Sequence, residues 1–357
     1  MYSYFTLYFK NLFSLKNNTP SDNLNNKLSE NKLLKKKIKR FIDLIEIKST
    51  LQGNILIGFD DKLKKKICIK KSLLKNINNN IDFKGRKIEE NFRYEISILK
   101  KLNLLNKDTY NGVPKYIDDW EDNTFLNLVI EKCHIDLFDY YIKMFKKENI
   151  SKSFESINSK NTYMENKKIS QKFIFTKKIF RQLIKTIHWF HNDIKICHLD
   201  LSLENLMLLN DSKTEPKLKI IDFGLCQDFS KKSNFLYNKF IGKLYYQSPE
   251  VFKCNKYYKK TIPNFYYDAR KADVWSIGIV LFVLLFGEYP YKYASKKYDR
   301  NFRKILGGPN TLEKWVTKNN KTHLLTLECL DLLKKILTFS KKRLTINEIL
   351  IHPFVKE

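Results

Sequence analysis

The fold of this chain is constrained most by two short apolar runs. Each run places an aspartate at the edge of a turn. The first reads His-Leu-Asp-Leu-Ser-Leu-Glu-Asn over His198–Asn205, and the second reads Ile-Ile-Asp-Phe-Gly over Ile220–Gly224. Between them lie the apolar segment Leu206–Leu209 and a polar turn at 210–216. Apolar segments separated by a polar turn predict a hairpin, which brings the two aspartates together.

This hairpin places Asp200, Asn205 and Asp222 around one point. Two carboxylates and an amide can hold Mg²⁺ through oxygen and leave one carboxylate free to accept a proton. The alternative is a hairpin whose aspartates are there by chance, because three-residue strings recur by accident. That alternative suits Asp-Phe-Gly alone, whereas the two strings together, in this order and at this spacing, favour a metal and proton-transfer site.

Length and composition allow one large core or two modest ones. The 357 residues are 43% hydrophobic and 14% aromatic, which excludes a disordered chain. Six cysteines form no Cys-x-x-Cys pair, and no signal peptide is evident. Both features favour free thiols in a reducing compartment, the cytoplasm or nucleus, over a disulfide framework or a zinc site.

The formal net charge of +29, with a pI of about 9.6, permits two interpretations. A strongly basic chain can bind nucleic acid or a membrane surface. The alternative is a compositional bias, because Lys, Asn, Ile, Phe and Tyr are over-used together while glycine and proline are scarce. The lysines occur in short runs along the whole chain, so we favour the bias and expect no specific nucleic-acid binding. The positive field still favours acidic protein substrates and partners.

One domain is expected at 33–357, preceded by an N-terminal extension and linker at 1–32. The aromatic and polar start of the chain is too short and too polar to span a bilayer, and it permits a surface-binding, docked or frayed segment. A polar Asn/Ser/Lys segment at 146–170 predicts a mobile loop. The most apolar run, at 279–286, predicts a buried core helix, so no transmembrane segment is expected. Nothing in the sequence sets an oligomeric state.

Three strand-like patterns open the domain, at Phe41–Ile47, Ile55–Phe59 and Ile67–Ile69. They predict the start of a β-rich unit, with Gly53 in its first turn and Lys70 at the end of its third strand.

Helical and strand patterns alternate after Lys70. A polar insertion is expected at 76–87, a helix at 92–102, an apolar strand at 126–130 and an amphipathic helix at 172–191. His188 and His191 lie one turn apart on the last helix, and with no further ligand nearby they are expected to be packed or solvated.

The two aspartate strings resemble the catalytic loop and the metal-binding Asp-Phe-Gly turn of eukaryotic protein kinases. Three further motifs follow the order of that family: Cys-Ile-Lys at Lys70, Ser-Pro-Glu at Glu250, and a terminal segment that contains Arg343. The resemblance covers Phe41 to Phe354. It implies an α+β, two-lobed fold, with a small β-rich lobe at about 33–133, a larger helical lobe at about 134–357, and ATP between them. It also implies a buried bridge between Arg343 and Glu250.

The resemblance also implies roles for individual residues. Asp200 would accept or orient the substrate hydroxyl proton, and Asn205 and Asp222 would hold Mg²⁺. Lys70 would grip the α- and β-phosphates and pair with Glu95. Glu89 and Glu90 remain open as competing partners of that lysine.

The hinge between the lobes is expected after a strand that ends at Ile130, the gatekeeper position. The backbone at Glu131 and Cys133 would then meet adenine, and Asp136 would reach the ribose or merely cap the helix that it precedes. Gly53 and Ile55, from the first turn and the second strand, complete the expected nucleotide contacts.

The chain departs from the family pattern at the phosphate loop and at the catalytic loop. Lys48 and Thr50 stand where the first two glycines of Gly-x-Gly-x-x-Gly are usual, and side chains there predict weaker nucleotide binding. Ser202 stands in place of the catalytic-loop lysine, and Lys243 stands in place of the activation-segment threonine. We hypothesise that Lys243 replaces the missing lysine and hydrogen-bonds Ser202 or Asp200; the alternative is that it faces solvent.

Leu199 replaces the arginine before the catalytic aspartate, which makes regulation by activation-loop phosphorylation less expected. The missing glycines and the Cys-Ile-Lys-Lys string are similar to the divergent FIKK kinases of apicomplexan parasites, although Cys68 breaks their name-giving motif. The Asp-Val-Trp-Ser string is equally typical of CAMK-like kinases.

The resulting prediction is a serine/threonine protein kinase that transfers the γ-phosphoryl group of Mg-ATP to protein hydroxyls. The alternative is a pseudokinase scaffold that keeps the fold and binds partners without phosphoryl transfer. A basic nucleic-acid-binding module is a distant third, because no readout motif is present.

Overall fold

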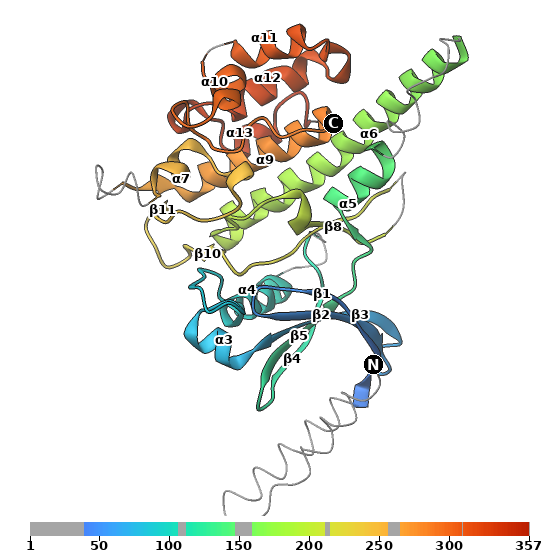
Figure 1. The fold of residues 1–357 in the computed structure, drawn as a ribbon, viewed down its shortest axis with the longest axis vertical. Coiled ribbons are helices and arrows are strands. Elements are labelled where there is room, and N and C mark those ends of the chain that lie inside the picture. The colour runs from blue at the N-terminus through green and yellow to red at the C-terminus, as the bar shows by residue number, and fades with distance from the viewer. Residues whose placement is uncertain are drawn as a thin grey trace, which may run out of the picture.

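The computed structural model describes residues 39–105, 112–146, 159–210, 215–255, 265–308 and 310–356. At 145–146 and 159–168 it describes the backbone alone. The chain forms a small lobe built on one sheet and a larger, mostly helical lobe (Figure 1). The two-lobed α+β fold expected from the sequence is therefore confirmed. The predicted extension at 1–32 lies outside the described residues.

The small lobe contains an antiparallel sheet with strand order β1-β2-β3-β5-β4. Its strands are β1 (Phe41–Ser49), β2 (Gly53–Asp60), β3 (Lys65–Leu73), β4 (Tyr116–Glu121) and β5 (Phe125–Glu131). The first three and β5 were predicted, whereas β4 was not. Ile67 and Ile69 occupy alternate positions of β3 and are buried, which suits a strand with one face against a core. Ile67, Ile69 and Val129 form the core of that face.

Two helices accompany the sheet, α3 (Leu74–Asn79) and α4 (Phe92–Leu105). The segment 76–87, expected as a polar insertion, therefore starts as a helix. Ile77 is the buried anchor of α3, and Asn80 ends that helix in the left-handed conformation. The prediction of a helix at 92–102 is confirmed, and its apolar side packs into the main core.

The larger lobe contains α5 (Leu137–Tyr141), α6 (Ser159–Trp189), α7 (Pro249–Lys253), α9 (Ala269–Phe286), α10 (Arg300–Leu306), α11 (Thr311–Lys318), α12 (Leu327–Ile336) and α13 (Ile346–Leu350). Helix α9 is the centre of this lobe and packs against α6 and α12. Nearly all of its residues are buried, which confirms the expected core helix. Among the described residues, no helix is long and apolar enough to span a membrane.

Helix α6 begins at Ser159, so the end of the loop predicted at 146–170 is helical instead. The stretch from 159 to 171 carries no glycine or proline, and nothing in it stops the amphipathic helix from extending backwards. The rest of that predicted loop lies outside the described residues or outside the described side chains.

Short strands connect the helices around the interlobe region. β6 (Ile135–Asp136), β8 (Leu206–Leu208) and β9 (Leu218–Ile220) form one small sheet. β7 (Ile196–Cys197) pairs with β10 (Gln227–Asp228), and β11 (Leu236–Tyr237) pairs with β12 (Tyr267–Asp268).

A buried ion pair fixes the end of the chain to α7. Arg343 donates from both terminal nitrogens to the Glu250 carboxylate, and Nη2 lies 3.2 Å from Oε2. The same guanidinium donates to the carbonyl oxygens of Lys271, Thr338 and Ile336. The predicted bridge between Arg343 and Glu250 is confirmed, and it is a fully satisfied polar network.

Candidate active site

The predicted hairpin is formed by β8 and β9, in which Leu206 pairs with Ile220 and Leu208 with Leu218. All four side chains are buried, so the hairpin is anchored in the main core. Asn205 precedes β8 directly and Asp222 follows β9, and the backbone amide of Ile221 donates to the Asn205 carbonyl. The hairpin therefore brings both residues to one edge, as predicted.

The Asn205 side chain connects this edge to the catalytic loop. Its Nδ2 donates to Asp200 Oδ2 at 2.8 Å and to the Asp200 carbonyl oxygen at 2.9 Å. Because the amide nitrogen is used in this way, the amide oxygen is the atom that remains for a cation. Burial raises the pKa of Asp200 to about 6, against the lowering effect of the Lys243 ammonium.

Both aspartates lie beside or in a left-handed turn. Leu199, just before Asp200, has φ of 63°, and Asp222 has φ of 67°. Non-glycine residues adopt this conformation at a cost that the surrounding structure must offset. At Leu199 the offset comes from Asp273 of α9, whose carboxylate accepts 2.8 Å hydrogen bonds from the backbone amides of His198 and Leu199.

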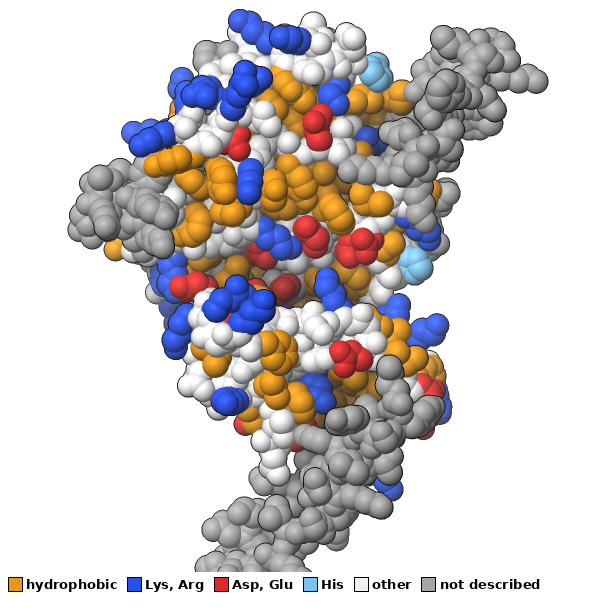
Figure 2. Space-filling model, viewed as in Figure 1, with side chains coloured by type: hydrophobic (Ala, Val, Ile, Leu, Met, Phe, Trp, Pro, Cys, Tyr) orange, Lys and Arg blue, Asp and Glu red, His pale blue; other side chains and the backbone are white. Residues whose placement is uncertain are grey.

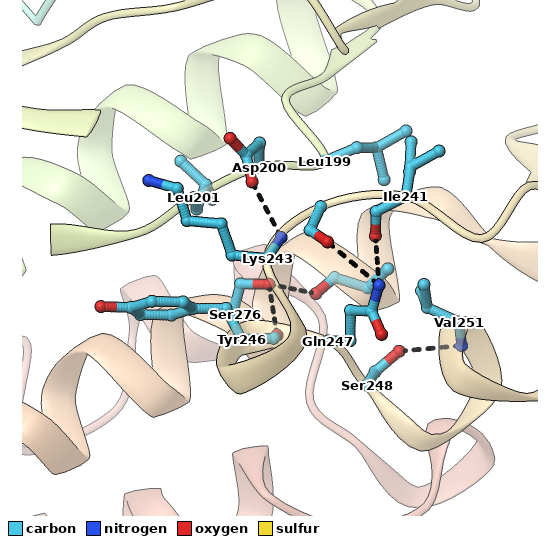
Figure 3. A pocket seen from close by; sticks show the side chains of 12 residues that line it. Leu199, Asp200, Leu201, Ile241, Lys243, Tyr246, Gln247, Ser248, Val251 and Ser276 are labelled. Atoms are coloured by element: carbon cyan, nitrogen blue, oxygen red, sulfur yellow. Dashed lines mark hydrogen bonds between the residues drawn. The ribbon is translucent and has the colours of Figure 1, made fainter. Parts of the chain in front are cut away.

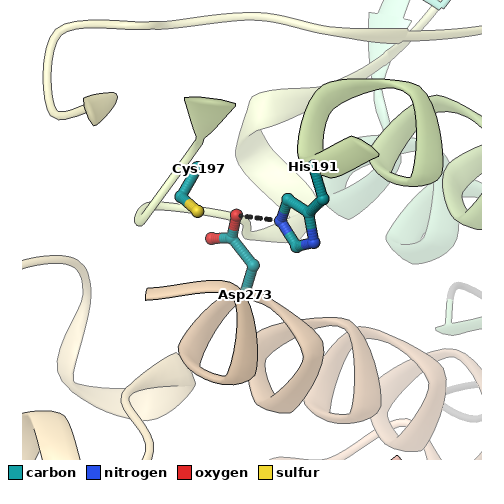
Figure 4. A group of neighbouring side chains, drawn as sticks. All are labelled: His191, Cys197 and Asp273. Carbon is teal, nitrogen blue, oxygen red and sulfur yellow. Dashed lines mark hydrogen bonds and ion pairs between the residues drawn. The ribbon is translucent and has the colours of Figure 1, made fainter. Parts of the chain in front are cut away.

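His191 Nε2 also bonds the Asp273 carboxylate, at 3.0 Å, with Cys197 beside them (Figure 4). A buried His/Cys/Asp cluster can hold a metal ion when its ligands are free and deprotonated. Here the three hydrogen bonds occupy the carboxylate, and burial raises the pKa of the Cys197 thiol well above its usual value. The cluster therefore braces the catalytic loop, and His191 is a packed histidine.

Lys70 lies between two carboxylates inside the cleft. Its Nζ is 2.6 Å from Glu95 Oε2 and 3.3 Å from Asp222 Oδ1. The two carboxylates outweigh the effect of burial and raise the pKa of Lys70. Burial acts to raise the pKa of Asp222, but the Lys70 ammonium dominates and holds it below its usual range.

Among the three glutamates left open as partners of Lys70, the structure selects Glu95. Glu89 instead pairs with Lys239, with 2.6 Å between Nζ and Oε2. Glu90 lines the cleft beside Gly224, and burial together with Asp222 raises its pKa to about 7. In the sequence Glu90 is a rival partner of Lys70, and nothing in its local pattern marks it as a further carboxyl group of the cleft.

Lys243 reaches the catalytic loop through both its side chain and its backbone. Nζ donates to Ser202 Oγ at 2.7 Å and lies 3.3 Å from Glu204 Oε2. The backbone amide donates to Asp200 Oδ1 at 3.1 Å (Figure 3). The predicted contact between Lys243 and Ser202 is confirmed. Glu204 is a third partner that the sequence did not suggest.

Gly242 makes the approach of Lys243 possible. It has φ of +79°, and a Cβ at this position would lie 2.6 Å from the Leu199 carbonyl oxygen. Only glycine allows this close contact between the two segments. Gln247 holds the same turn by donating from Nε2 to the carbonyl oxygens of Ile241 and Gly242 (Figure 3).

A cavity of about 300 Å³ lies between the lobes, over these groups. The predicted residues that line it are Ile55, Lys70, Glu95, Asp200, Asn205, Asp222 and Lys243. Ser202 lies below the cavity, fully buried, and contributes through Lys243. Such a cavity, lined by carboxylates, amides and three ammonium groups, suits a polyphosphate with its divalent cation.

Four predicted nucleotide contacts do not line this cavity: Gly53, Glu131, Cys133 and Asp136. Gly53 is not within the turn but begins β2, where a Cβ would lie 1.8 Å from the Lys71 carbonyl oxygen.

The three hinge residues are engaged within the protein. The Glu131 amide donates to Lys115, Cys133 is buried, and Asp136 caps α5 by accepting from the Asp139 amide at 2.8 Å. The capping alternative for Asp136 is therefore observed.

Lys48 and Thr50, which stand at the positions of the first two glycines of Gly-x-Gly-x-x-Gly, both line the cavity. Thr50 also closes the turn, because its Oγ1 accepts a hydrogen bond from the Gly53 amide at 3.0 Å. The neighbouring Gln52 is buried and donates from Nε2 to the carbonyl oxygens of Asn76 and Ile81. This anchor could not be predicted, since a glutamine in a turn gives no sequence signal of burial.

The family model for the protein kinase domain matches residues 51–355. The chain is 35% identical over 179 residues to serine/threonine-protein kinase SAPK2 of Oryza sativa subsp. japonica, which covers 49% of this chain and 46% of that protein. It is 36% identical over 179 residues to serine/threonine-protein kinase SRK2H of Arabidopsis thaliana, covering 49% and 43%. The match thus spans less than half the length of these curated relatives.

Proposed function

The chain belongs to the protein kinase domain family, and on that premise we propose that it transfers the γ-phosphoryl group of Mg-ATP to serine or threonine hydroxyls of protein substrates. The observation that carries the proposal is the convergence of Lys70, Asp200, Asn205 and Asp222 on one interlobe cavity, with the ion pair between Lys70 and Glu95 already formed. Phosphoryl transfer needs mainly positioning and charge neutralisation, and these residue types supply both.

Asn205 and Asp222 would hold the magnesium ion. The donor set fits a hard cation, because Asp222 is ionised and the Asn205 amide oxygen is the atom left after its nitrogen bonds Asp200. When bound, Mg²⁺ would supply positive charge that neutralises the phosphates. Lys70, held by Glu95, would bind the α- and β-phosphates.

Asp200 would accept or orient the proton of the substrate hydroxyl. With a pKa of about 6 it is ionised at neutral pH, yet basic enough to hold a proton at the moment of transfer. Its hydrogen bonds to Asn205 and to the Lys243 amide fix the direction of the carboxylate. The second of these bonds links the acceptor site to the activation segment.

Lys243 would supply the positive charge that the catalytic loop lacks at Ser202. An ammonium on a flexible stem can neutralise a phosphate from either side of the cleft. Its side chain is 39% exposed, so Nζ can turn from Ser202 and Glu204 toward a bound γ-phosphate. Ser202 and Glu204 would hold the ammonium in place before the nucleotide enters.

Nucleotide binding is expected to be weaker than is usual in the family, because Lys48 and Thr50 occupy cavity positions where glycine normally lies. Ile55 would pack on the base, and Gly53 would keep β2 close to β3. We retain the hinge backbone at Glu131 and Cys133 as the expected adenine contact.

Asp136 would hydrogen-bond the ribose while its Oδ1 continues to cap α5. The free thiols of all six cysteines favour a reducing compartment, the cytoplasm or nucleus. Protein substrates would be favoured when acidic, since the net charge is +29.

The second candidate is a pseudokinase scaffold, which the side chains of Lys48 and Thr50 in the nucleotide cavity favour. A Mg-ATP autophosphorylation assay on the full chain separates the two functions, with Asp200→Asn as the matched control. Incorporation of phosphate by the wild type, lost in Asp200→Asn, supports the kinase. Equal background incorporation by both proteins, with ATP still bound, would establish the scaffold.

A further inference from the structure

A second large cavity, of about 1000 Å³, lies on the larger lobe and shares no lining residue with the interlobe cavity. Helices α7 and α10 and the turn at 338–342 border it. Its apolar lining includes Trp275, Phe302 and Leu337, and Phe339 stands at its rim with 63% of its surface exposed. We call this cavity the basic groove, because of the side chains around it.

Six lysines line the basic groove: Lys253, Lys296, Lys297, Lys334, Lys341 and Lys342. All except Lys334 are exposed. Lys296 Nζ lies 5.6 Å from the centre of the Phe339 ring, and Lys253 Nζ lies 5.8 Å from the centre of the Phe265 ring. Lysines and arginines gather beside hydrophobic side chains around α7 and α10 (Figure 2). The groove thus presents ammonium groups and aromatic faces side by side.

The basic groove contains little charge that could neutralise these lysines. Glu250 is its single acidic lining residue, and its carboxylate is bound by Arg343. Lys334 pairs with Glu313, at 2.9 Å. Within the described part of the chain, no ion pair is formed by the other five lysines. Six lysines against one glutamate is a larger basic excess than in the whole chain, which holds 67 basic and 38 acidic residues.

We propose that the basic groove docks a glutamate- and aspartate-rich segment of the protein substrate, and that an aromatic or aliphatic side chain of this segment packs against Phe302 and Phe339. Complementary charge gives such a contact its selectivity and speed, and burial of the apolar side chain gives it affinity. The role as a substrate site depends on the proposed function, whereas the binding chemistry of the groove does not.

Helix α7 connects the basic groove to the acceptor site. Ser248 and Val251 line a small pocket that also includes Asp200 and Lys243 (Figure 3). Pro249 and Phe252, both in α7, line the groove. A substrate segment held in the groove is therefore separated by one short helix from Asp200, the carboxylate that would accept the proton of the substrate hydroxyl. Docking there would raise the local concentration of the acceptor.

The test uses a fluorescein-labelled synthetic peptide made of glutamates with two interspersed phenylalanines and no hydroxyl group. Its binding to the full chain is measured by fluorescence anisotropy without ATP. The triple variant Lys296→Glu, Lys297→Glu, Lys341→Glu should bind at least about threefold more weakly, because three exposed ion pairs are lost and each contributes about 1.5- to 5-fold. Phe339→Ala, which removes an exposed ring, should weaken binding independently. Replacement of the glutamates of the peptide by glutamine should abolish it.

The matched control is Lys62→Glu, Lys65→Glu, Lys66→Glu, which makes the same charge change at exposed positions around the β2–β3 turn. This variant should bind the peptide as the wild type does. Equal losses in both triple variants, unchanged binding in the groove variants, or equal binding of a single-stranded RNA probe would each overturn the proposal. Circular dichroism before the assay confirms that each variant is folded.

Kinetics then separate the docking site from the activity itself. With a glutamate-rich protein substrate, the groove variant should show a KM at least about threefold higher and an unchanged kcat, since the same three ion pairs are lost. Peptide binding without any phosphate transfer by the wild type would refute the proposed function and leave docking intact. Phosphate transfer with the same KM in wild type and groove variant would refute docking and leave the function intact.

Discussion

Removal of the Lys243 side chain tests the proposed chemistry most sharply. Lys243→Ala deletes the ammonium that contacts Ser202 and Glu204 but keeps the backbone hydrogen bond to Asp200. A preorganised group that stabilises the transferring charge is typically worth about 10²–10³ in turnover, or roughly 3–4 kcal/mol of barrier. We expect kcat to fall by that factor. ATP binding should change little, because the ion pair of Lys70 with Glu95 is untouched.

The pH profile of the same variant gives a second readout. Burial raises the pKa of Asp200 to about 6, and the Lys243 ammonium opposes that rise. The ionised carboxylate is the form that can accept a proton, so wild-type activity should fall as the pH drops through about 6. Without the ammonium the carboxylate is harder to ionise. The acid limb of the Lys243→Ala profile should therefore move to higher pH.

Steady-state phosphate transfer from labelled ATP measures both effects, and calorimetric titration measures ATP binding. Lys239→Ala is the matched control, because it removes an ammonium from the same segment that pairs with the exposed Glu89. Such a surface pair is worth about 0–1 kcal/mol, so this control should remain close to the wild type. A Lys243→Ala enzyme that is as fast as wild type, with an unmoved acid limb, would refute the role of Lys243. The family membership would not be affected.

Three further predictions concern the metal site, the nucleotide loop and the core. Asp222→Asn should abolish Mg²⁺-dependent transfer while circular dichroism shows an intact fold; turnover near that of the wild type would rule out the metal role. Lys48→Gly with Thr50→Gly should tighten ATP binding in a calorimetric titration, and unchanged or weaker binding would reject the steric argument. Arg343→Ala should lower the free energy of unfolding by about 3–5 kcal/mol in urea titrations, because it leaves the buried carboxylate of Glu250 without its partner. A loss below about 1 kcal/mol would show that water replaces the guanidinium.

The parts of the site that could be predicted from sequence are those that local pattern encodes. The hairpin follows from two apolar runs around a polar turn, and its pairing fixes Asn205 next to Asp222. The pairing of Lys70 with Glu95 was implied by the resemblance to protein kinases, and the structure contains it. The sequence favoured Glu95 but left Glu89 and Glu90 open, because it does not show that α4 begins only at Phe92 and carries Glu95 in its first turn.

The elements that were missed depend on contacts distant in sequence. Strand β4 contains Asp118, Asp119 and Glu121, residues that strands disfavour, and Arg40 compensates by pairing with Asp118 at 3.3 Å. Helix α3 is rich in asparagine, and the buried Ile77 fixes it in place.

Asp273 could not be recognised as the support of the catalytic loop. Its partners there are the backbone amides of His198 and Leu199, 75 and 74 positions earlier in the chain. Backbone amides leave no trace in the sequence, since every residue except proline carries one. The strained turn at Leu199 and the aspartate that supports it can therefore be matched only in the folded chain.

The double variant Ser202→Lys with Lys243→Thr tests whether the two residues exchanged the roles of lysine and hydroxyl. Ser202 is fully buried, and its Oγ faces the ammonium of Lys243, so the two side chains share one space. Removing the lysine at 243 makes room for a lysine at 202, whose head can leave the buried position along the same path. Because the longer side chain must still pass through a closely packed site, we expect recovery of only part of the turnover that Lys243→Ala loses. Ser202→Lys alone should be worse than the double variant, since it places two ammonium groups in that space. If the double variant had no higher turnover than Lys243→Ala or Ser202→Lys, the two positions would act independently and the exchange hypothesis would fail.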